Sequence, residues 1–514
     1  MTQGTALSIL KTGANVFLTG EPGSGKTYTI NSYVAYLNQH GIKSAITAST
    51  GIAATYIGGM TIHSWSGIGI KKALSLEEEK VIAKRAAKRI KRPSVLIIDE
   101  ISMLDNNTLN LVDLICKIAR SSSMPFGGMQ VVLVGDFFQL PPVARESEAL
   151  PKFAFESQAW KLANFSVCYL SDQYRQSDLN FLNLLSAIRS GLVSSVHREY
   201  LDSRLMTGSI NSNFTKLFPH NKDVDHINSL ELEKLPGEER VFTMKEYGRD
   251  VLVEQLKRGC LSPEQLKLKK GALVMFTKNN FEYGFVNGTL GTVIGFYGEN
   301  KYPIIKTKQG KEVFTELMDW TIGEDGEVVA GIKQIPLRLA WAMTVHKSQG
   351  ITLDAAFMDL SEAFVEGQGY VALSRLKTLN GLYLGGYNEK ALKVHPAIIV
   401  QDNAFRQQSL ATESHHGNLS KEEIAQLYKN FIFTSGGQFS TKTEKVQIQE
   451  KTYSIESIRE KHLNAYKPWC KDEESLLTDY FNSGKKTKEI ANLLGRQSGG
   501  IRSRLKKLGL IQEA

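Results

Sequence analysis

The stretch Gly20-Glu21-Pro22-Gly23-Ser24-Gly25-Lys26-Thr27 decides the fold of this chain. It follows a short apolar run, Val16-Phe17-Leu18, and it opens a helix-compatible segment that ends near Gly41. The pattern G-x-x-x-x-G-K-[ST] between a strand and a helix indicates a phosphate-binding loop. Its glycines let backbone N–H groups converge on phosphate oxygens, and the start of the following helix adds a partial positive charge.

We therefore predict that this loop binds ATP or a close relative. Lys26 would reach the β- and γ-phosphates, and the Thr27 hydroxyl would be a ligand of Mg²⁺. The remaining cofactor-binding positions of the loop would be Gly20, Gly23, Ser24 and Gly25. The alternative is a glycine-rich turn without a ligand, but a strand, a loop and a helix in register favour the nucleotide.

The composition is that of a large globular protein with a basic charge. A chain of 514 residues is too long for one core and suggests about three or four domains. Hydrophobic residues make up 42% and charged residues 22%, which is ordinary for a folded protein. The formal net charge of +9 suggests an anionic partner beyond the nucleotide, with nucleic acid the leading candidate.

The sequence predicts no membrane partner and a cytoplasmic location. No apolar run approaches the length of a membrane span, and Met1-Thr2-Gln3-Gly4 does not begin a secretory signal. Four cysteines lie far apart without the spacing of metal ligands: Cys116, Cys168, Cys260 and Cys470. We expect reduced thiols in a cytoplasmic protein, associated with the nucleoid if the source is a bacterium.

Residues 1–190 are predicted to form an α/β domain. Three apolar runs have the length and β-branched content of buried parallel strands: Ala45-Ile46-Thr47, Val95-Leu96-Ile97-Ile98 and Val131-Val132-Leu133-Val134. Separated by helical stretches, they imply a parallel sheet with helices on both faces. A small insertion at about 66–93 contains a charged segment, Leu76 to Lys91. We interpret it as a solvated helix, with contact to nucleic acid as the alternative.

A second α/β domain is predicted for residues 191–400. It is interrupted at about 287–333 by a segment rich in Gly, Thr and Val, with turn signals such as Asn287-Gly288. We interpret that segment as a small inserted β-rich module. Residues 401–455 are predicted to be a linker with some helix.

Two carboxylates end an apolar strand, Leu96-Ile97-Ile98-Asp99-Glu100. ATP hydrolysis needs one group to hold Mg²⁺ and another to orient and deprotonate the attacking water. We assign Asp99 to the metal and Glu100 to the water. An acidic turn after a strand is the alternative, but the phosphate loop upstream favours catalysis.

Three further residues are candidates for sensing or stabilising the transferred phosphoryl group. Gln139 follows the turn Gly135-Asp136, which can bring its amide to the γ-phosphate. Arg175 and Arg375 suit the charge that develops on the phosphoryl group. Taken singly, Gln139 fits a loop residue and each arginine fits a surface ion pair. An arginine that reaches the nucleotide from the second domain would couple ATP to domain closure, as in a motor.

Taken together, the motifs resemble those of superfamily 1 DNA helicases of the RecD-like branch, and most of all the petite-integration-frequency (Pif-type) helicases. The supporting stretches run in the family's order from Gly20 to Arg375. They are Thr50-Gly51-Ile52-Ala53-Ala54, Thr61-Ile62-His63-Ser64, Asp99-Glu100-Ile101-Ser102-Met103, Phe126-Gly127-Gly128, Gly135-Asp136-Phe137-Phe138-Gln139-Leu140-Pro141-Pro142-Val143, Thr344-Val345-His346-Lys347-Ser348-Gln349-Gly350 and Tyr370-Val371-Ala372-Leu373-Ser374-Arg375.

The resemblance implies two RecA-like P-loop domains with an SH3-like insertion, and an ATP-dependent helicase that moves 5′ to 3′ on single-stranded DNA. It implies that Gln3 reads the adenine and that Gly350 lies near the γ-phosphate. It places five residues along the strand, where they would grip phosphates and sugars rather than read bases: Thr50, His63, His346, Lys347 and Ser348. A translocase or an ATP-switched clamp without productive unwinding is the alternative.

The resemblance also implies the partners. They are single-stranded DNA and single-strand/double-strand junctions, with quadruplex or forked DNA as further substrates, and the protein would act as a monomer. Family members work in DNA replication, DNA repair and telomere maintenance.

Residues 456–514 resemble a small all-α helix-turn-helix or Myb-like unit. Two helical patterns precede a strongly basic third one, which contains Arg502 and Arg504. A helix of this kind can enter a major groove, so we expect both arginines to contact DNA. A protein-docking or solvated surface is the alternative.

Overall fold

The computed structural model describes most of the chain. It covers residues 1–56, 59–69, 71–142, 152–171, 178–206, 215–218, 224–280, 283–307, 310–324, 327–345, 348, 351–438, 471–483, 485, 487–496, 501, 504–505, 508 and 510. The chain divides into two compact units, Met1–Ser440 and Thr441–Ala514.

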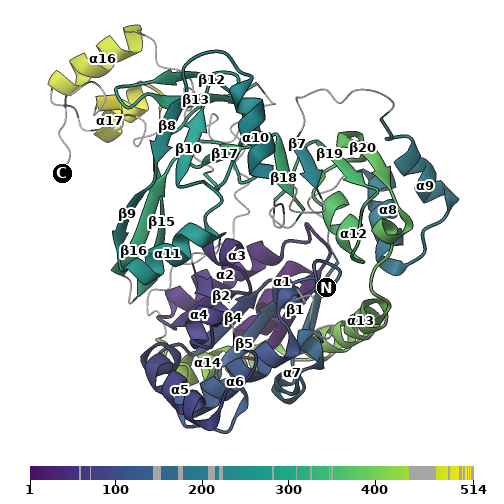
Figure 1. The fold of residues 1–514 in the computed structure, drawn as a ribbon. Helices are drawn as coiled ribbons and strands as arrows, with labels where there is room; N and C mark the ends of the chain where they lie inside the picture. Colours follow the sequence, from purple (N-terminus) through teal and green to yellow (C-terminus); the bar gives the residue numbers. More distant parts are fainter. Residues whose placement is uncertain are drawn as a thin grey trace. The chain divides into compact units, whose positions relative to one another are not determined.

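A six-stranded parallel sheet lies at the centre of the first domain (Figure 1). Its order is β3-β2-β4-β5-β1-β6, and every pairing is parallel. All five residues of β1 and of β5 are buried, as a sheet covered on both faces requires. The three strands predicted from apolar runs are therefore confirmed. The bounds are β1 Val16–Gly20, β2 Ser44–Ala48, β3 Met60–Thr61, β4 Val95–Asp99, β5 Gln130–Val134 and β6 Ser166–Leu170.

Several helices of the first domain begin at polar caps, and their apolar faces are buried on the sheet. Asp105 caps α6 by accepting a hydrogen bond from the Thr108 N–H, and Val112 and Ile115 of α6 are fully buried. The opposite face of the sheet packs on Leu10 of α1 and Leu37 of α2. The bounds are α1 Gln3–Lys11, α2 Lys26–Gln39, α3 Gly51–Tyr56, α4 Ile62–Ser66, α5 Leu76–Lys91, α6 Asn106–Arg120 and α7 Gln158–Ala163, with 3₁₀ turns at Ile101–Met103, Pro125–Gly128 and Ala154–Glu156.

The charged insertion forms α5, as predicted. Acidic residues in its first turn and basic residues in its last turn complement the helix dipole. Small side chains, Ala83 and Ala86, pack it closely against the domain. Arg89 also donates hydrogen bonds to the carbonyl oxygens of Trp65 and Ser64, so this helix holds α4 in place.

The second domain contains a four-stranded parallel sheet of order β18-β7-β19-β20. Helix α8 contacts α9 and α12, so packing of the second domain begins before residue 190. The bounds are β7 Thr215–Phe218, β18 Ala342–Thr344, β19 Ala356–Leu360, β20 Leu382–Tyr387, α8 Leu179–Ser190, α9 Ser195–Asp202, α10 Val224–Glu233 and α12 Gln368–Leu373, with 3₁₀ turns at Leu379–Gly381 and Glu389–Leu392.

The inserted β-rich module is larger than the segment 287–333. Its five-stranded antiparallel sheet, β14-β13-β12-β11-β17, takes β11 and β17 from either side of that segment. A second sheet, β15-β16-β9, packs on α11. The bounds are β8 Arg240–Thr243, β9 Lys245–Gly248, α11 Asp250–Gly259, β10 Gln265–Leu268, β11 Leu273–Phe276, β12 Leu290–Tyr297, β13 Tyr302–Thr307, β14 Glu312–Phe314, β15 Met318–Glu324, β16 Glu327–Gln334 and β17 Leu337–Leu339.

The region predicted as a linker begins with two packed helices, which we call the return helices: α13 Pro396–Gly417 and α14 Lys421–Thr434. Figure 1 shows α13 leaving the second domain and running back to the first, where it packs along β6. Helix α14 lies on α1, where the Ser8 hydroxyl hydrogen-bonds the His416 ring (2.7 Å) and the Tyr428 hydroxyl (2.5 Å). The prediction missed this packing because it depends on contacts about 400 residues apart in sequence.

The C-terminal unit has its own small core. Helices α16 Lys471–Asn482 and α17 Thr487–Leu493 bury Leu477 and Ile490 together with Ile501 and Leu505 of the third helical segment. Across the described parts of both units, no helix combines the length and apolar character that crossing a bilayer requires.

Candidate active site

The phosphate loop lies at the carboxyl end of β1, where it turns directly into α2. Gly23 and Gly25 adopt left-handed backbone conformations, with φ of 91° and 90°. The Lys26 ammonium donates to the carbonyl oxygens of Gly20 (2.7 Å) and Glu21 (3.1 Å), so it lies inside the loop. The Ser24 hydroxyl is buried there and has no hydrogen-bond partner among the described residues. A bound phosphate would supply that partner, so the loop fits the predicted nucleotide.

Gln3 lies over this loop, as the adenine-reading prediction requires. It opens α1, and its side-chain Nε2 donates to the Ser24 carbonyl oxygen at 3.2 Å. The approach is so close that a Cβ on Gly25 would lie 1.8 Å from that nitrogen. Gln3 therefore connects the start of α1 to the phosphate loop, whether or not it also contacts a base.

Asp99 and Glu100 lie at the carboxyl end of β4, with their charges near Lys26. The Glu100 backbone is left-handed (φ 53°), and its N–H donates to Asp99 Oδ1 at 2.8 Å. Burial raises the pKa of Asp99. Burial and the neighbouring Asp99 charge raise the pKa of Glu100 to about 7, while the Lys26 charge opposes both shifts. A strained backbone and a raised carboxyl pKa are frequent at catalytic positions.

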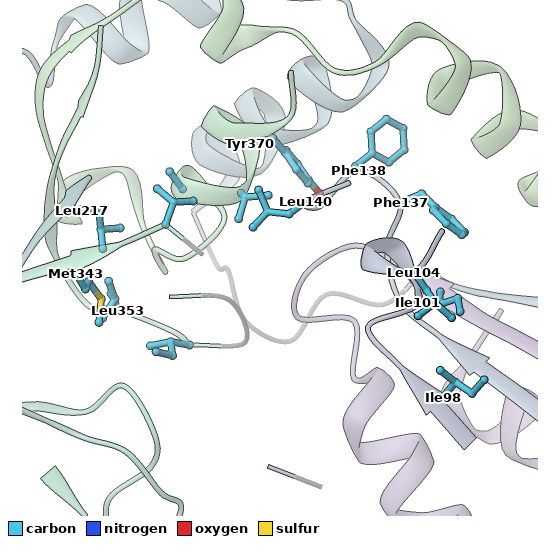
Figure 2. Close-up of a cluster of buried hydrophobic side chains, with 14 of the residues drawn as sticks. Ile98, Ile101, Leu104, Phe137, Phe138, Leu140, Leu217, Met343, Leu353 and Tyr370 are labelled. Atoms are coloured by element: carbon cyan, nitrogen blue, oxygen red, sulfur yellow. The ribbon is translucent and has the colours of Figure 1, made fainter. Parts of the chain in front are cut away.

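The loop after β5 carries Gln139 to the face of the second domain. Gln139 is buried, with 7% of its surface exposed. Gly367, which opens α12 at φ 85°, approaches so closely that a Cβ there would lie 3.2 Å from the Phe138 carbonyl oxygen. Figure 2 shows Phe138 and Leu140 of this loop beside Tyr370 of α12. The two domains are therefore in direct contact at the candidate γ-phosphate sensor.

Arg375 follows α12 in the second domain, and its charge affects Glu100 of the acidic pair. It is fully buried, and its guanidinium donates to the Val371 carbonyl oxygen and to the Ser374 hydroxyl, both at 2.9 Å. Burial lowers the pKa of Arg375, and the Glu100 charge opposes this shift. Conversely, the Arg375 charge opposes the rise in the pKa of Glu100. The structure thus brings Arg375 within electrostatic reach of Glu100 across the domain boundary.

Two candidate strand contacts lie at the carboxyl edge of the first sheet. Thr50 follows β2, and its hydroxyl accepts the Ala53 N–H. His63 follows β3 on α4 and is half-buried. Burial lowers the pKa of His63, although the charge of Asp105 opposes the shift. Burial thus favours the neutral imidazole, which could offer a phosphate a hydrogen bond rather than a charge.

Other predicted site residues are placed differently or lie outside the described residues. Ser348 is buried, and its hydroxyl donates to the Val345 carbonyl oxygen at 2.7 Å, so it orders a turn instead of presenting a hydroxyl to a strand. Arg504 forms an ion pair with Glu474 within the C-terminal unit, with which a DNA phosphate would compete. Five predictions fall outside the described residues: Arg175, His346, Lys347, Gly350 and Arg502.

Sequence reasoning missed Arg189, the buried arginine of α8. The signal was present, because the helix buries Phe181, Leu184, Leu185 and Ile188 at helical spacing and Arg189 extends that apolar face. An arginine is seldom buried unless it is paired, so its position predicts acidic partners.

A phosphate loop at the carboxyl edge of one parallel sheet, with Arg375 of a second such domain within electrostatic reach of Glu100 at the same edge, defines a two-domain nucleotide-driven motor. The PIF1-like helicase family matches residues 5–199, and the 2B domain of DNA helicase Pif1 matches residues 252–296. The ATP-dependent DNA helicase Pif1 of Psychrobacter sp. is 42% identical over 501 residues, which cover 85% of this chain and 75% of that protein. The chain belongs to the PIF1-like helicase family, and it is an ATP-dependent DNA helicase.

Solved structures agree. Pif1 from Bacteroides sp. in complex with ADP-AlF4 is 29% identical, covers 79% of this chain and 96% of its own, and superposes with a TM-score of 0.67. Pif1 from Candida albicans is 34% identical, covers 78% of this chain and 98% of its own, and has a TM-score of 0.62. Bacteroides Pif1 bound to single-stranded DNA is 29% identical, covers 79% of this chain and 97% of its own, and has a TM-score of 0.53.

Replacing Gln3 with Ala tests whether this side chain reads the base. If Gln3 hydrogen-bonds adenine, Gln3→Ala should weaken ATP binding about tenfold and should change GTP binding much less. Equilibrium titration with both nucleotides measures this difference. An equal loss for ATP and GTP would mean that Gln3 only orders the loop through Ser24.

Proposed function

We propose that this helicase hydrolyses ATP to move 5′ to 3′ along single-stranded DNA and opens the duplex ahead of it. The observation that carries this proposal is the position of Arg375, which lies in the second domain and acts on Glu100 of the first. A nucleotide between the domains would draw them together, and its hydrolysis would release them. Alternate gripping by the two domains would advance the protein along the strand.

The nucleotide would be held mainly by the phosphate loop. We propose that Lys26 moves from the carbonyl oxygens of the loop to the β- and γ-phosphates. Among the described residues, no three His, Cys, Asp or Glu side chains form a metal cluster. Thr27 and Asp99 are nevertheless a suitable pair, because Mg²⁺ in P-loop enzymes takes one hydroxyl and one carboxylate and completes its shell with phosphates and water. When bound, Mg²⁺ neutralises charge on the phosphates.

Glu100 is the proposed general base. Its raised pKa, about 7, suits a group that accepts a proton from water near neutral pH. We propose that Gln139 senses the γ-phosphate and that Arg375 stabilises the charge that develops on it. Two residues keep the roles that the family resemblance implies. Arg175 would stabilise the charge on the phosphoryl group, and Gly350 would lie near the γ-phosphate.

The single strand would cross the carboxyl edges of both parallel sheets. On the first domain, Thr50 and His63 lie along this edge. On the second, His346 and Lys347 follow β18 in sequence. These residue types bind phosphates and sugars, as a motor that must hold any sequence requires. The Bacteroides complex with single-stranded DNA supports this assignment.

Junctions are the proposed substrate, with forked and quadruplex DNA included. We propose that one copy suffices for movement along a single strand. A solved structure of two coordinating Pif1 helicases at forked double-stranded DNA suggests that a second copy can join at a fork.

Matched duplexes with either a 5′ or a 3′ single-stranded tail test direction and unwinding together. We expect ATP-dependent strand separation only from the 5′ tail. Lys26→Ala serves as the blank, because it removes the phosphate contact. Unwinding only from the 3′ tail would overturn the direction, and DNA-stimulated hydrolysis without unwinding from either tail would favour the translocase or clamp.

Glu100→Gln tests the general base. The amide keeps the shape of the side chain but cannot accept the proton, so turnover with saturating DNA should fall at least about 100-fold. Affinity for ATP should stay within about twofold, since the phosphate loop is intact. Phosphate release and fluorescent-nucleotide titration measure the two quantities. Wild-type turnover in this variant would assign the base elsewhere.

Removing residues 466–514 tests the C-terminal unit as a DNA-binding accessory. Because Met1–Ser440 is a separate compact unit, ATPase activity stimulated by a single strand should be retained. Affinity for duplex or forked DNA should fall about tenfold, with a shallower dependence on salt. Unchanged affinity at several salt concentrations would mean that the unit does not bind DNA.

A further inference from the structure

The Arg189 guanidinium joins three parts of the motor. Its Nη1 donates to both carboxylate oxygens of Asp136, at 2.9 and 2.8 Å, and to the Tyr370 hydroxyl at 2.9 Å. Its Nη2 donates to the Tyr169 hydroxyl at 2.8 Å and to Asp402 at 3.3 Å. Asp136 follows β5 in the first domain, Tyr370 lies on α12 in the second, and Asp402 lies on the return helix α13.

Two of the residues that Arg189 joins, Asp136 and Tyr370, lie next to the candidate active site. Asp136 is three residues before Gln139, and the Gln139 N–H donates to the Asp136 carbonyl oxygen at 3.0 Å. Tyr370 lies on α12, and Arg375 follows five residues later, in the turn after that helix. The guanidinium also lies 4.0 Å from the ring centre of Phe138, which stands beside Tyr370 in Figure 2. A shift of the loop after β5 is therefore passed directly to the helix that leads to Arg375.

A second arginine extends the junction to the phosphate loop. Arg406 of α13 donates to Asp402 at 2.8 Å and to the Tyr169 hydroxyl at 2.6 Å. It also lies 3.9 Å from the carboxylate of Glu21, within the phosphate loop. Contacts therefore run without a break from the phosphate loop through α13 and Arg189 to α12.

Burial makes it costly to separate the charged groups of this junction. Asp136 and Arg189 are both buried, at 0% and 3% exposure. Burial alone would lower the pKa of Arg189, but the charge of Asp136 and the contacts with Tyr370 and Tyr169 raise it well above its usual value. Separating the pair would leave an uncompensated charge away from water, which is strongly unfavourable. The loop and α12 must therefore either move together or rearrange through a different set of partners.

We propose that Arg189 is a positioning residue. It transmits the state of the loop after β5, which carries Gln139, to α12 and to the return helix α13. Arg189 touches neither nucleotide nor DNA in this role. It fixes Asp136 relative to Tyr370, and so it sets the position of Gln139 relative to Arg375. This role rests on the proposed function, because it matters only if the two domains work across a shared ATP.

Tyr370→Phe is the variant that tests the role with least damage. Arg189→Ala would leave buried carboxylates without a partner and could prevent folding, whereas Tyr370→Phe removes one hydroxyl and keeps both charges paired. With saturating single-stranded DNA, we expect kcat for ATP hydrolysis to fall about five- to tenfold, the lower end of typical coupling effects. The KM for ATP should stay within about twofold, because the phosphate loop is unchanged.

Tyr33→Phe is the matched control. Tyr33 is also fully buried, and its hydroxyl donates to Gln130 at 2.5 Å within the core of the first domain, away from Arg189. It should lose a similar amount of stability and leave both kcat and KM near wild-type values. If Tyr370→Phe and Tyr33→Phe behave alike, Arg189 has a structural role only and the proposal is wrong.

Asp402→Asn supplies a second measurement if Tyr370→Phe proves unstable. It removes the charge on the far side of Arg189, and we expect the same selective loss of DNA-stimulated kcat. Wild-type kcat in a folded Asp402→Asn would overturn the proposal. A wild-type protein without DNA-stimulated turnover would instead contradict the proposed function itself, so the two failures are distinguishable.

Discussion

The contact between the loop after β5 and the start of α12 is the constraint on which the motor depends. A Cβ at Gly367 would press against the Phe138 carbonyl oxygen at 3.2 Å, and Asp136 of the buried Asp136–Arg189 pair lies on the same loop. In the proposed function, this packing would hold the two parallel sheets so that groups from both domains meet at one nucleotide. The ATPase chemistry on one sheet would then drive movement of the other, which neither domain could do alone.

Two other contacts bring distant parts of the chain to this joint. The return helices carry the chain from the second domain back to the first and place Arg406 near Glu21 of the phosphate loop. The β-rich module meets the first domain where α11 packs on α3, with the backbones of Gly51 and Gly259 close together. Because Thr50 directly precedes α3, this second contact lies at the proposed path of the strand. In the proposed function, nucleotide and strand would thus act on domain contacts that share the same sheet edge.

The sequence predicts those features that depend on neighbouring residues. Three features are short patterns whose chemistry is local: the phosphate loop, the Asp99-Glu100 pair and the buried strands of the first sheet. The structure contains these strands, with the loop after β1 and the acidic pair at the end of β4. Contacts between distant segments were not predictable in this way. The return helices look like a polar linker because α13 is polar along much of its length, and only its packing along β6 reveals its role. Arg189 was missed because its partners lie 53, 181 and 213 residues away.

Closure of the two domains on ATP is tested most directly by a distance between them. Spin labels at the exposed positions Ser123 in the first domain and Lys234 in the second would report it by electron paramagnetic resonance, in a variant whose accessible thiols are replaced by serine. We expect the distance to shorten and its distribution to narrow when ADP and aluminium fluoride are added with Mg²⁺. An unchanged distribution, with the nucleotide bound, would contradict coupling between the nucleotide and the domain contact.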